Sequence, residues 1–299
     1  MIAALDLNPF DILISIFSFI LATLHSAFSS VGPLRAIGSF GLAIVALTII
    51  MRTLLFPLFA WQLRITKRTQ AETAKIQPQL AELRKKYKGQ KLNEEVQKVY
   101  REHNANPMGM MLGCVPMVIQ ALLIYPLYFA IRSASKNLRT DLGFLWIPDV
   151  TRTTKEACCQ IGKTAANGTE HFQGWLSGFA QHPWFLLLPL LAGLATLVQS
   201  RMMLTPPPKN ATPQMQATQN MGKQMVLLAP VTIFLVGLNF AQGIALYWVT
   251  QSTYMIVQQF YLLVIKDYHS LGGDHIPHPP WVIKMRRALG LHDAGASAK

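Results

Sequence analysis

Apolar residues gather along the chain in long runs, which polar and charged segments separate. A helix rises 1.5 Å per residue, so about 20 apolar residues cross the roughly 30 Å of hydrocarbon in a bilayer. Five runs predict such helices, at residues 38–60, 110–131, 183–203, 224–239 and 243–265. The fourth run is the shortest and predicts a tilted helix or a locally thinned bilayer. The predicted fold class is therefore all-α, a polytopic membrane protein with five transmembrane helices.

The apolar stretch at residues 10–28 has a different pattern, because its small and polar residues recur every three or four positions. These residues are Asp11, Ser15, Ser18, Ala22, His25, Ser26 and Ser29. One polar face and one apolar face favour an amphipathic helix that lies in the membrane interface, and a sixth span is the alternative. No Lys or Arg precedes Arg35, so we expect residues 1–37 to be an uncleaved N-terminal tail and interfacial helix.

Composition supports a membrane protein. The chain is 51% hydrophobic and 14% charged with a mean hydropathy of +0.28, whereas soluble domains carry about 25% charged residues. The net charge of +13 is typical of cytoplasmic loops, so we expect no specific nucleic acid partner. Lys and Arg number eleven in the loop 61–109 and six in the loop 132–182. The first of these loops and the C-terminal tail, residues 266–299, are therefore predicted to be cytoplasmic, and the second external.

The loop 61–109 contains two short amphipathic patterns. The first follows Pro78 and ends before Gly89, and the second runs from Leu92 to His103. Together they predict an antiparallel helical hairpin over residues 78–104, with a solvated charged loop as the alternative. The apolar faces of this hairpin are expected to consist of Leu80, Leu83, Tyr87, Val96, Val99 and Tyr100.

Two further segments lack a clear periodic pattern. Residues 204–222 are rich in Pro, Gln and Met, which predicts a flexible loop. The cysteines Cys114, Cys158 and Cys159 have no metal-binding spacing and define no disulfide framework. We therefore predict no metal site and no cofactor.

Arg52 is the most informative residue, since it interrupts the first predicted span. A charged side chain at the centre of a span costs about 2.5–3.5 kcal/mol on insertion scales. No Asp or Glu lies in the five spans to neutralise it. Arg52 lies roughly nine residues from the predicted helix end, or about 13 Å, which is a long reach for a side chain that extends to the headgroups. We therefore expect Arg52 to face a hydrated cavity.

Other polar residues of the spans are candidates to line this cavity. Thr48 lies one turn before Arg52, Gln120 lies in the second span, and the last span contains Thr250, Gln251 and Ser252. Helix–helix contact is the alternative role for each of them. No GxSxG, HExxH or Walker motif and no paired carboxylates occur in the spans, so the chain is not expected to be an enzyme.

Several motifs in a fixed order resemble one family. They are Arg52 followed by Pro57, Gln77-Pro78, Asn106-Pro107-Met108-Gly109 leading to Pro116 and Gln120, the segment from Phe144 to Asp149, and the segment from Gly243 to Trp248 leading to Gln258-Gln259. Across residues 38–265 this set is similar to the YidC/Oxa1/Alb3 membrane protein insertases. The resemblance implies a five-helix core with a hydrophilic groove open to the cytoplasm and the lipid. It implies Arg52 and Thr48 as groove residues, and Tyr247 and Trp248 as residues that contact client helices. With Gln120 and Gln251 from the polar pattern, these make up the predicted groove set.

The resemblance also implies partners and a location. Nascent membrane proteins are the expected clients, membrane lipids the surroundings, and the Sec translocon and the ribosome further partners, with the chain acting as a monomer. The expected location is the bacterial plasma membrane, with a cytoplasmic C-terminus. The alternatives from the residues alone are an anion channel or transporter that uses the same polar cavity, and a chaperone that assembles helices already inserted.

Overall fold

A computed structural model describes residues 9–103, 115–137, 142–159, 179–180, 182–204, 213–266 and 279–291. The chain divides into two compact units, and each unit is built from three segments that alternate along the sequence. Unit 1 comprises Met1–Leu54, Ile119–Val198 and Leu228–Tyr254. Unit 2 comprises Leu55–Val118, Gln199–Leu227 and Met255–Lys299. Three expectations lie outside the described residues: the environment of Cys114, the motif at 106–109 and the start of the second span.

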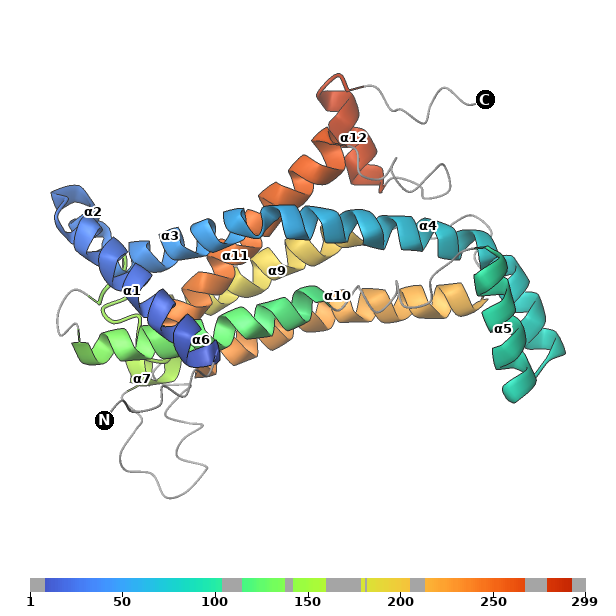
Figure 1. Ribbon diagram of the computed structural model, residues 1–299. Coiled ribbons are helices and arrows are strands. Elements are labelled where there is room, and N and C mark those ends of the chain that lie inside the picture. Colours follow the sequence, from blue (N-terminus) through green and yellow to red (C-terminus); the bar gives the residue numbers. More distant parts are fainter. Residues whose placement is uncertain are drawn as a thin grey trace, which may run out of the picture. The chain divides into compact units, whose positions relative to one another are not determined.

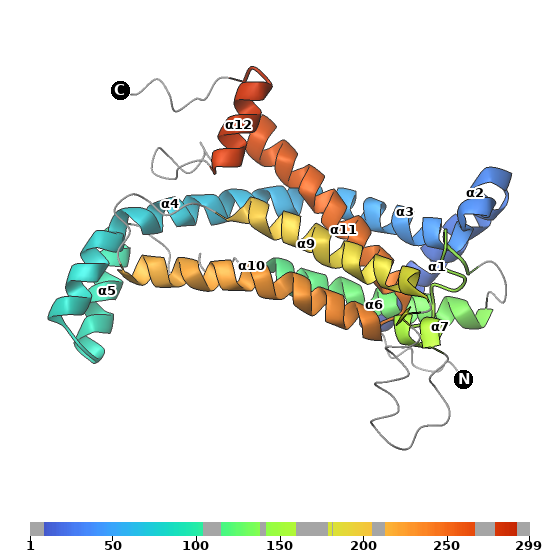
Figure 2. The ribbon, with the colours of Figure 1, turned by 180° about the vertical axis from the view of Figure 1, so that it is seen from behind.

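The regular elements in the described part of the chain are all helices, as the sequence predicts (Figures 1 and 2). Its helices are α1 (Pro9–Ser29), α2 (Gly32–Ile37), α3 (Ser39–Leu54), α4 (Phe56–Lys86), α5 (Gln90–Glu102), α6 (Val115–Asn137), α7 (Thr154–Cys159), the 3-10 helix η2 (Pro183–Leu186), α9 (Leu187–Met203), α10 (Pro213–Asn239), α11 (Gln242–Phe260), the π-helix η3 (Tyr261–Ile265) and α12 (Pro280–Ala288).

Three described helices are long and apolar enough to cross a membrane: α1, the continuous η2 and α9, and α10 from Gly222 to Asn239. Helix α3 and the start of α4 make a fourth if they are taken together as one bent span. Helix α6 contains a shorter apolar section, Val118–Ser133. The count of five spans stays a prediction, as does the choice between an interfacial and a spanning α1.

The first predicted span, 38–60, is not one continuous helix. Helix α3 ends at Leu54, and α4 starts at Phe56 with Pro57 in its first turn. A proline has no backbone N–H to donate to the preceding turn, and its ring disfavours a helical conformation in the residue before it. The interruption at Leu55 therefore follows from Pro57, which the sequence pattern identified only as part of a family motif.

Helix α10 corrects a second expectation. The flexible loop predicted over residues 204–222 is wrong from Pro213 onward, where α10 begins and continues for 27 residues. Proline is favoured in the first turn of a helix, and the Gln, Met and Ala residues that follow are good helix formers. The predicted run 224–239 is short because it covers only the apolar part of α10, and the helix itself begins earlier.

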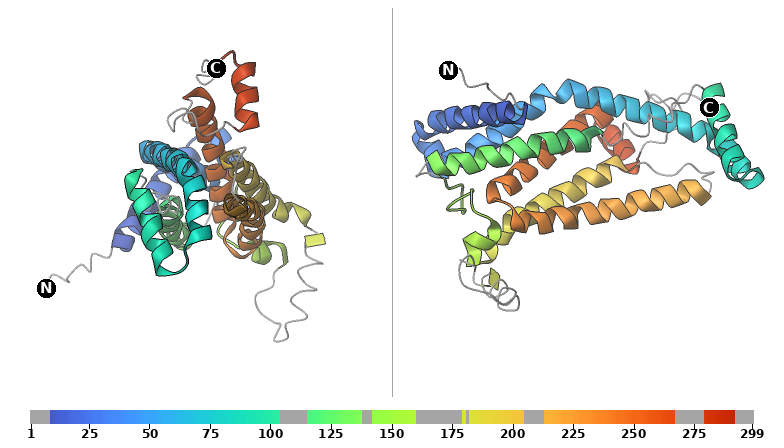
Figure 3. Two further views of the ribbon diagram at one scale, coloured as in Figure 1. Left: turned by 90° about the vertical axis from the view of Figure 1, so that its right-hand side faces the viewer. Right: turned by 60° about the horizontal axis from the view of Figure 1, so that its bottom comes forward.

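In unit 1, helix α1 lies along α3 (Figure 3). Phe17 and Leu21 of α1 join a buried core with Phe40 and Ile44 of α3 and with residues from three further helices, α6, α9 and α11. One polar pair lies within this contact. The His25 Nδ1 and Ser39 Oγ atoms are 3.0 Å apart and hydrogen-bonded, and both residues are buried. Among the apolar residues of α1, Phe17 and Leu21 are therefore buried. Ile12, Ile16 and Phe19 remain exposed, as suits a surface in contact with lipid.

Residues 142–155, which we call the strap, cross the end of unit 1 where α3 and α11 begin. A tight turn is closed by paired backbone bonds of 2.8 Å between Phe144 and Ile147, and the Leu145 N–H donates to the Ile37 carbonyl at 2.8 Å. Gly38 makes this approach possible, because its φ of 118° and its lack of a side chain leave room for the Gly143 carbonyl. The strap is therefore connected to the chain between the end of α2 and the start of α3.

Unit 2 contains two separate apolar clusters. In the first, Leu262, Leu263 and Val264 of η3 pack with Ala60 of α4 and Val282 of α12. The Arg286 guanidinium of α12 is buried and donates from Nη1 to the Val264 carbonyl at 2.6 Å. This bond satisfies a carbonyl at the end of the helix and ties α12 to η3. The second cluster is formed by α4 and α5.

We predict that Gly38→Ala destabilises unit 1. A Cβ atom there would lie 2.4 Å from the Gly143 carbonyl oxygen, at a φ that side chains rarely adopt. Backbone strain alone is expected to lower the free energy of unfolding by about 1–3 kcal/mol. Thermal unfolding in detergent measures the effect. Gly32→Ala is the matched control, since a Cβ atom on Gly32 would have no neighbouring atom within 4 Å, and equal losses for both variants would contradict the strap contact.

Candidate functional site

Arg52 lies in the last turn of α3 rather than in the middle of a helix. The expected distance of nine residues to the helix end is therefore wrong, because Pro57 ends α3 early. Its side chain is nevertheless only 3% exposed, so it is enclosed by protein rather than extended along the surface. A cation in the last turn of a helix is favoured by the partial negative charge of the terminal carbonyls.

A polar network within unit 1 surrounds the guanidinium. Arg52 Nη2 donates to Gln120 Oε1 of α6 at 2.7 Å. Gln120 Nε2 donates to Tyr247 Oη at 3.1 Å and to Gln251 Oε1 at 2.8 Å, both on α11. Three helices far apart in the sequence therefore meet in one hydrogen-bonded set, and all four of its residues were predicted as groove residues.

Gln120 is the centre of this network, because both its amide oxygen and its amide nitrogen form hydrogen bonds. Its oxygen accepts from Arg52, and its nitrogen donates to Tyr247 and Gln251. The opposite orientation of the amide would place N–H groups against the guanidinium, so the network determines the orientation. A neutral amide oxygen thus solvates the cation in place of water.

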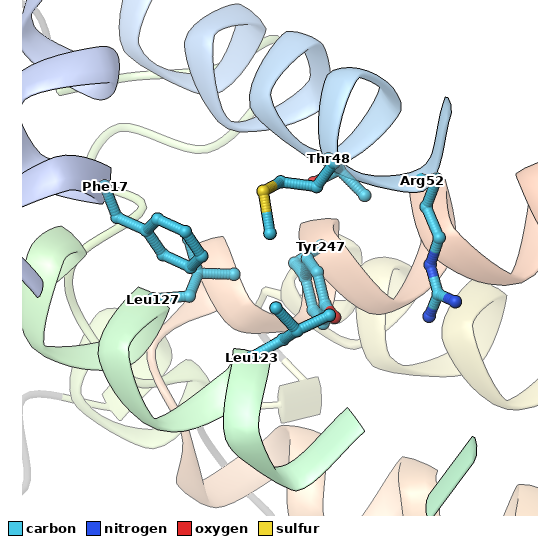
Figure 4. Close-up of a pocket in the computed structure, with 7 residues that line it drawn as sticks. Phe17, Thr48, Arg52, Leu123, Leu127 and Tyr247 are labelled. Atoms are coloured by element: carbon cyan, nitrogen blue, oxygen red, sulfur yellow. The ribbon is translucent and has the colours of Figure 1, made fainter. Parts of the chain in front are cut away.

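The pocket beside Arg52 is narrow and mostly apolar in its lining (Figure 4). Its open space admits about one water molecule. Arg52 and Thr48 reach it from α3, and Tyr247 reaches it from α11. The remaining lining residues are Phe17, Met51, Leu123 and Leu127. These four were not predicted, because an apolar residue that lines a pocket has the same sequence pattern as one in a core. A wide hydrated groove stays a prediction.

The other two predicted groove residues lie differently. Thr48 lines the pocket, but its hydroxyl donates to the Ile44 carbonyl of its own helix at 2.7 Å. Trp248 is buried, and its ring meets that of Phe240 edge-on with a centroid distance of 6.2 Å. It is not among the pocket-lining residues. Successive residues of a helix point about 100° apart, so Tyr247 and Trp248 cannot both face the same point.

The predicted hairpin is formed by the end of α4 and by α5, both in unit 2. Helix α4 is continuous through Pro78, so the expected start of the first arm at this proline is wrong. Ile76 and Leu80 are buried, and Val96, Val99 and Tyr100 pack against them. Leu83 is half-buried and Tyr87 is exposed. The apolar contact therefore lies one turn earlier on α4 than the sequence pattern suggested.

The surface of the hairpin is charged. Lys98 Nζ is hydrogen-bonded to Glu95 Oε1 one turn away, and this bond raises the pKa of Lys98. Earlier on α4, before the hairpin, Arg68 forms a similar pair with the partly exposed Glu72. Exposed pairs of this kind contribute little to stability. Among the described residues no group of three or more His, Cys, Asp or Glu is placed to hold a metal.

Together, the apolar helices and the buried polar network define a helical integral membrane protein with a cation held between its helices. The family described as 60Kd inner membrane protein matches residues 34–268. The chain belongs to this family, which includes the YidC and Oxa1 proteins. The resemblance noted from the sequence motifs is thereby confirmed.

Individual proteins similar to this chain carry the name membrane protein insertase. The protein named membrane protein insertase YidC from Pelobacter propionicus is 33% identical over 232 residues, which are 76% of this chain and 36% of that protein. Membrane protein insertase MisCB from Bacillus subtilis is 31% identical, with 75% of this chain and 72% of that protein covered. Membrane protein insertase YidC 1 from Halalkalibacterium halodurans is 29% identical over 231 residues, which are 75% of this chain and 70% of that protein. The chain thus spans about a third of the first relative and about seven tenths of the others.

We predict that Gln120→Leu destabilises the protein by about 1–3 kcal/mol, because buried polar groups lose their hydrogen-bond partner. Thermal unfolding in detergent measures the loss. The same substitution in an Arg52→Met background should cost clearly less, since the guanidinium is then absent. A double-mutant cycle gives the coupling, and additive effects would contradict a direct Arg52–Gln120 interaction.

We also predict that Leu80→Ala loosens the contact between α4 and α5. Leu80 is 1% exposed, and truncation of a fully buried leucine costs about 2–5 kcal/mol. Limited proteolysis should cleave residues 86–103 faster in this variant. Leu83→Ala, at a half-buried position of the same helix, serves as the control and should change the cleavage rate less.

Proposed function

We propose that this chain is a membrane protein insertase and chaperone that helps hydrophobic segments of nascent proteins enter the bilayer. The observation that carries the proposal is a buried arginine solvated by a neutral amide between helices of an integral membrane protein. Membership of the 60Kd inner membrane protein family and the insertase names of its relatives support it. The proposed action is not enzymatic and needs no cofactor.

The physical task of such a protein is to carry a short polar flank across hydrocarbon. Moving an unsatisfied peptide group or a carboxylate through lipid costs several kcal/mol per group. A site that already contains fixed polar groups lowers this cost, because the flank exchanges water for prepared partners. Arg52, Gln120 and Gln251 supply donors and acceptors of this kind.

We propose that Arg52 attracts acidic residues in the flank. Its partner in the network, Gln120 Oε1, is uncharged, and a carboxylate bound to a guanidinium makes stronger, frequently bidentate bonds. An incoming Asp or Glu can therefore displace the amide oxygen. The apolar segment of the client then moves along α11 past Tyr247 and Trp248 into lipid.

We propose that the hairpin of α4 and α5 receives the client from the cytoplasm. Its exposed face carries many Lys and Arg residues, which suits a position at an anionic cytoplasmic surface. The chain is proposed to act as a monomer in the bacterial plasma membrane, with its C-terminus in the cytoplasm. The ribosome and the Sec translocon are proposed as further partners.

The test is insertion of a small single-span protein into liposomes that contain the purified chain. Arg52→Ala should slow insertion of a client with acidic flank residues about tenfold or more, the factor that corresponds to a loss of about 1.4 kcal/mol. Arg52→Lys, which keeps the charge, should retain most of the rate. A client whose flank carries Asn in place of Asp should depend less on Arg52.

Equal insertion rates of the acidic client with wild type and Arg52→Ala would contradict the electrostatic role. The same liposomes distinguish the anion channel or transporter, because anion flux without any insertion would favour that alternative. A late chaperone is distinguished by site-specific cross-linking from Tyr247, since it should contact only helices that are already inserted.

A further inference from the structure

Helix α12 lies beside η3 (Figure 1), in a part of unit 2 where predicted spans end. Its Val282 belongs to a buried cluster with Ala60 of α4 and Val264 of η3, and Met203 of α9 packs against the same cluster. These three partners are the last or next-to-last residues of the first, third and fifth predicted spans. Alternate spans of one chain end on the same side of a membrane, here the predicted cytoplasmic side. Helix α12 is therefore attached at the level where hydrocarbon gives way to headgroups.

The attachment uses one face of a short helix. Helix α12 has nine residues, and isolated helices shorter than about 12 residues are marginal in water. Val282 lies in the cluster, and Arg286, one turn later, is buried and donates from Nη1 to the Val264 carbonyl at 2.6 Å. The position of this face determines which side chains of α12 point away from the protein.

The opposite side of α12 is basic. Lys284 and Arg287 lie roughly 140–200° around the helix from the face that packs on η3, and both are exposed. Between this basic side and η3 lies an apolar edge, in which Met285 is 44% exposed and Leu289 is 52% exposed. No Asp or Glu occurs in the segment 275–292. The exposed part of α12 thus combines two cations with an apolar edge, and its own segment supplies no carboxylate to neutralise them.

We propose that α12 is an interfacial helix whose basic side binds the headgroups of anionic phospholipids. An amphipathic helix in the membrane interface places its apolar residues against acyl chains and its Lys and Arg residues among headgroups. Anionic lipids of the cytoplasmic leaflet attract such cations. Nucleic acid also attracts Lys and Arg, but its backbone offers no counterpart to the exposed Met285 and Leu289. This surface does not depend on the insertase function, because only the span ends and the exposed side chains define it.

A fluorophore on α12 tests the lipid contact. Ala288 is exposed and lies between the basic side and the apolar edge. The variant is Ala288→Cys, labelled with an environment-sensitive dye, in a full-length chain whose native cysteines are replaced by serine. It is reconstituted in phosphatidylcholine nanodiscs that contain an increasing fraction of phosphatidylglycerol. Phosphatidylglycerol should protect the dye from acrylamide, a neutral quencher dissolved in water. Sodium chloride at about 1 M should weaken this protection, since the Debye length is then about 3 Å.

Charge removal gives the second measurement. Lys284→Gln and Arg287→Gln should each raise the phosphatidylglycerol fraction for half-maximal protection about fivefold, the factor that corresponds to about 1 kcal/mol for one charge. The double variant should show no protection over the same range. Lys85→Gln with Lys91→Gln is the matched control, since it removes the same charge from exposed positions of the hairpin and should leave the dye on α12 unaffected.

Equal quenching in neutral and anionic nanodiscs would overturn the proposal, and so would protection that persists in the double variant. Protection by added RNA in phosphatidylcholine nanodiscs, without any effect of phosphatidylglycerol, would assign the basic side to nucleic acid and would also overturn it. The lipid and salt titrations leave Lys284 and Arg287 in place, so they decide the question even if the double variant does not fold.

Discussion

A guanidinium that lies inside a membrane segment has to be solvated by the protein itself. Arg52 is 3% exposed, and its bond to Gln120 replaces a bond to water. That amide is in turn held by Tyr247 and Gln251. Because an isolated charge in a medium of low dielectric constant is costly, the helices that carry these groups, α3, α6 and α11, are required to meet at this point.

The same constraint relates the site to its surroundings. Apolar side chains of α1 and α6 close the pocket around Arg52 and keep it narrow, which strengthens every polar interaction inside it. At the end of the unit, the strap adds backbone bonds to the start of α11, and its Ile147 and Val150 lie in the same buried core. Unit 1 thus combines the buried polar network around Arg52 with a close-packed apolar core that extends to the strap.

Unit 2 is held together by different means. Leu80 and Ile76 of α4 are buried by α5, while α12 is fixed to η3 by Val282 and by the bond from Arg286 to a helix-terminal carbonyl. These contacts are small compared with the core of unit 1. Small contacts open at low free-energy cost, which suits elements proposed to receive a client.

The sequence by itself determined the helical membrane class and the polar residues of the site. Arg52, Gln120 and Gln251 were predicted because a polar residue in an apolar run needs a reason to be there, and such a residue is visible in the sequence alone. The apolar face of the hairpin was predicted with an offset of one turn, since Ile76 precedes Pro78 and was assigned to the preceding segment.

Tertiary structure decided the helix ends and the partners. Pro57 interrupts a helix, whereas Pro78 lies inside one and Pro213 starts one, and these outcomes depend on which carbonyls and neighbours are available in space. Likewise, only the folded chain shows that Gln120 joins Arg52 to α11, that Trp248 faces elsewhere, and that the strap is bonded to the backbone at the start of α11. Helical periodicity determines the face on which a side chain lies, but the packing of distant segments determines what that face meets.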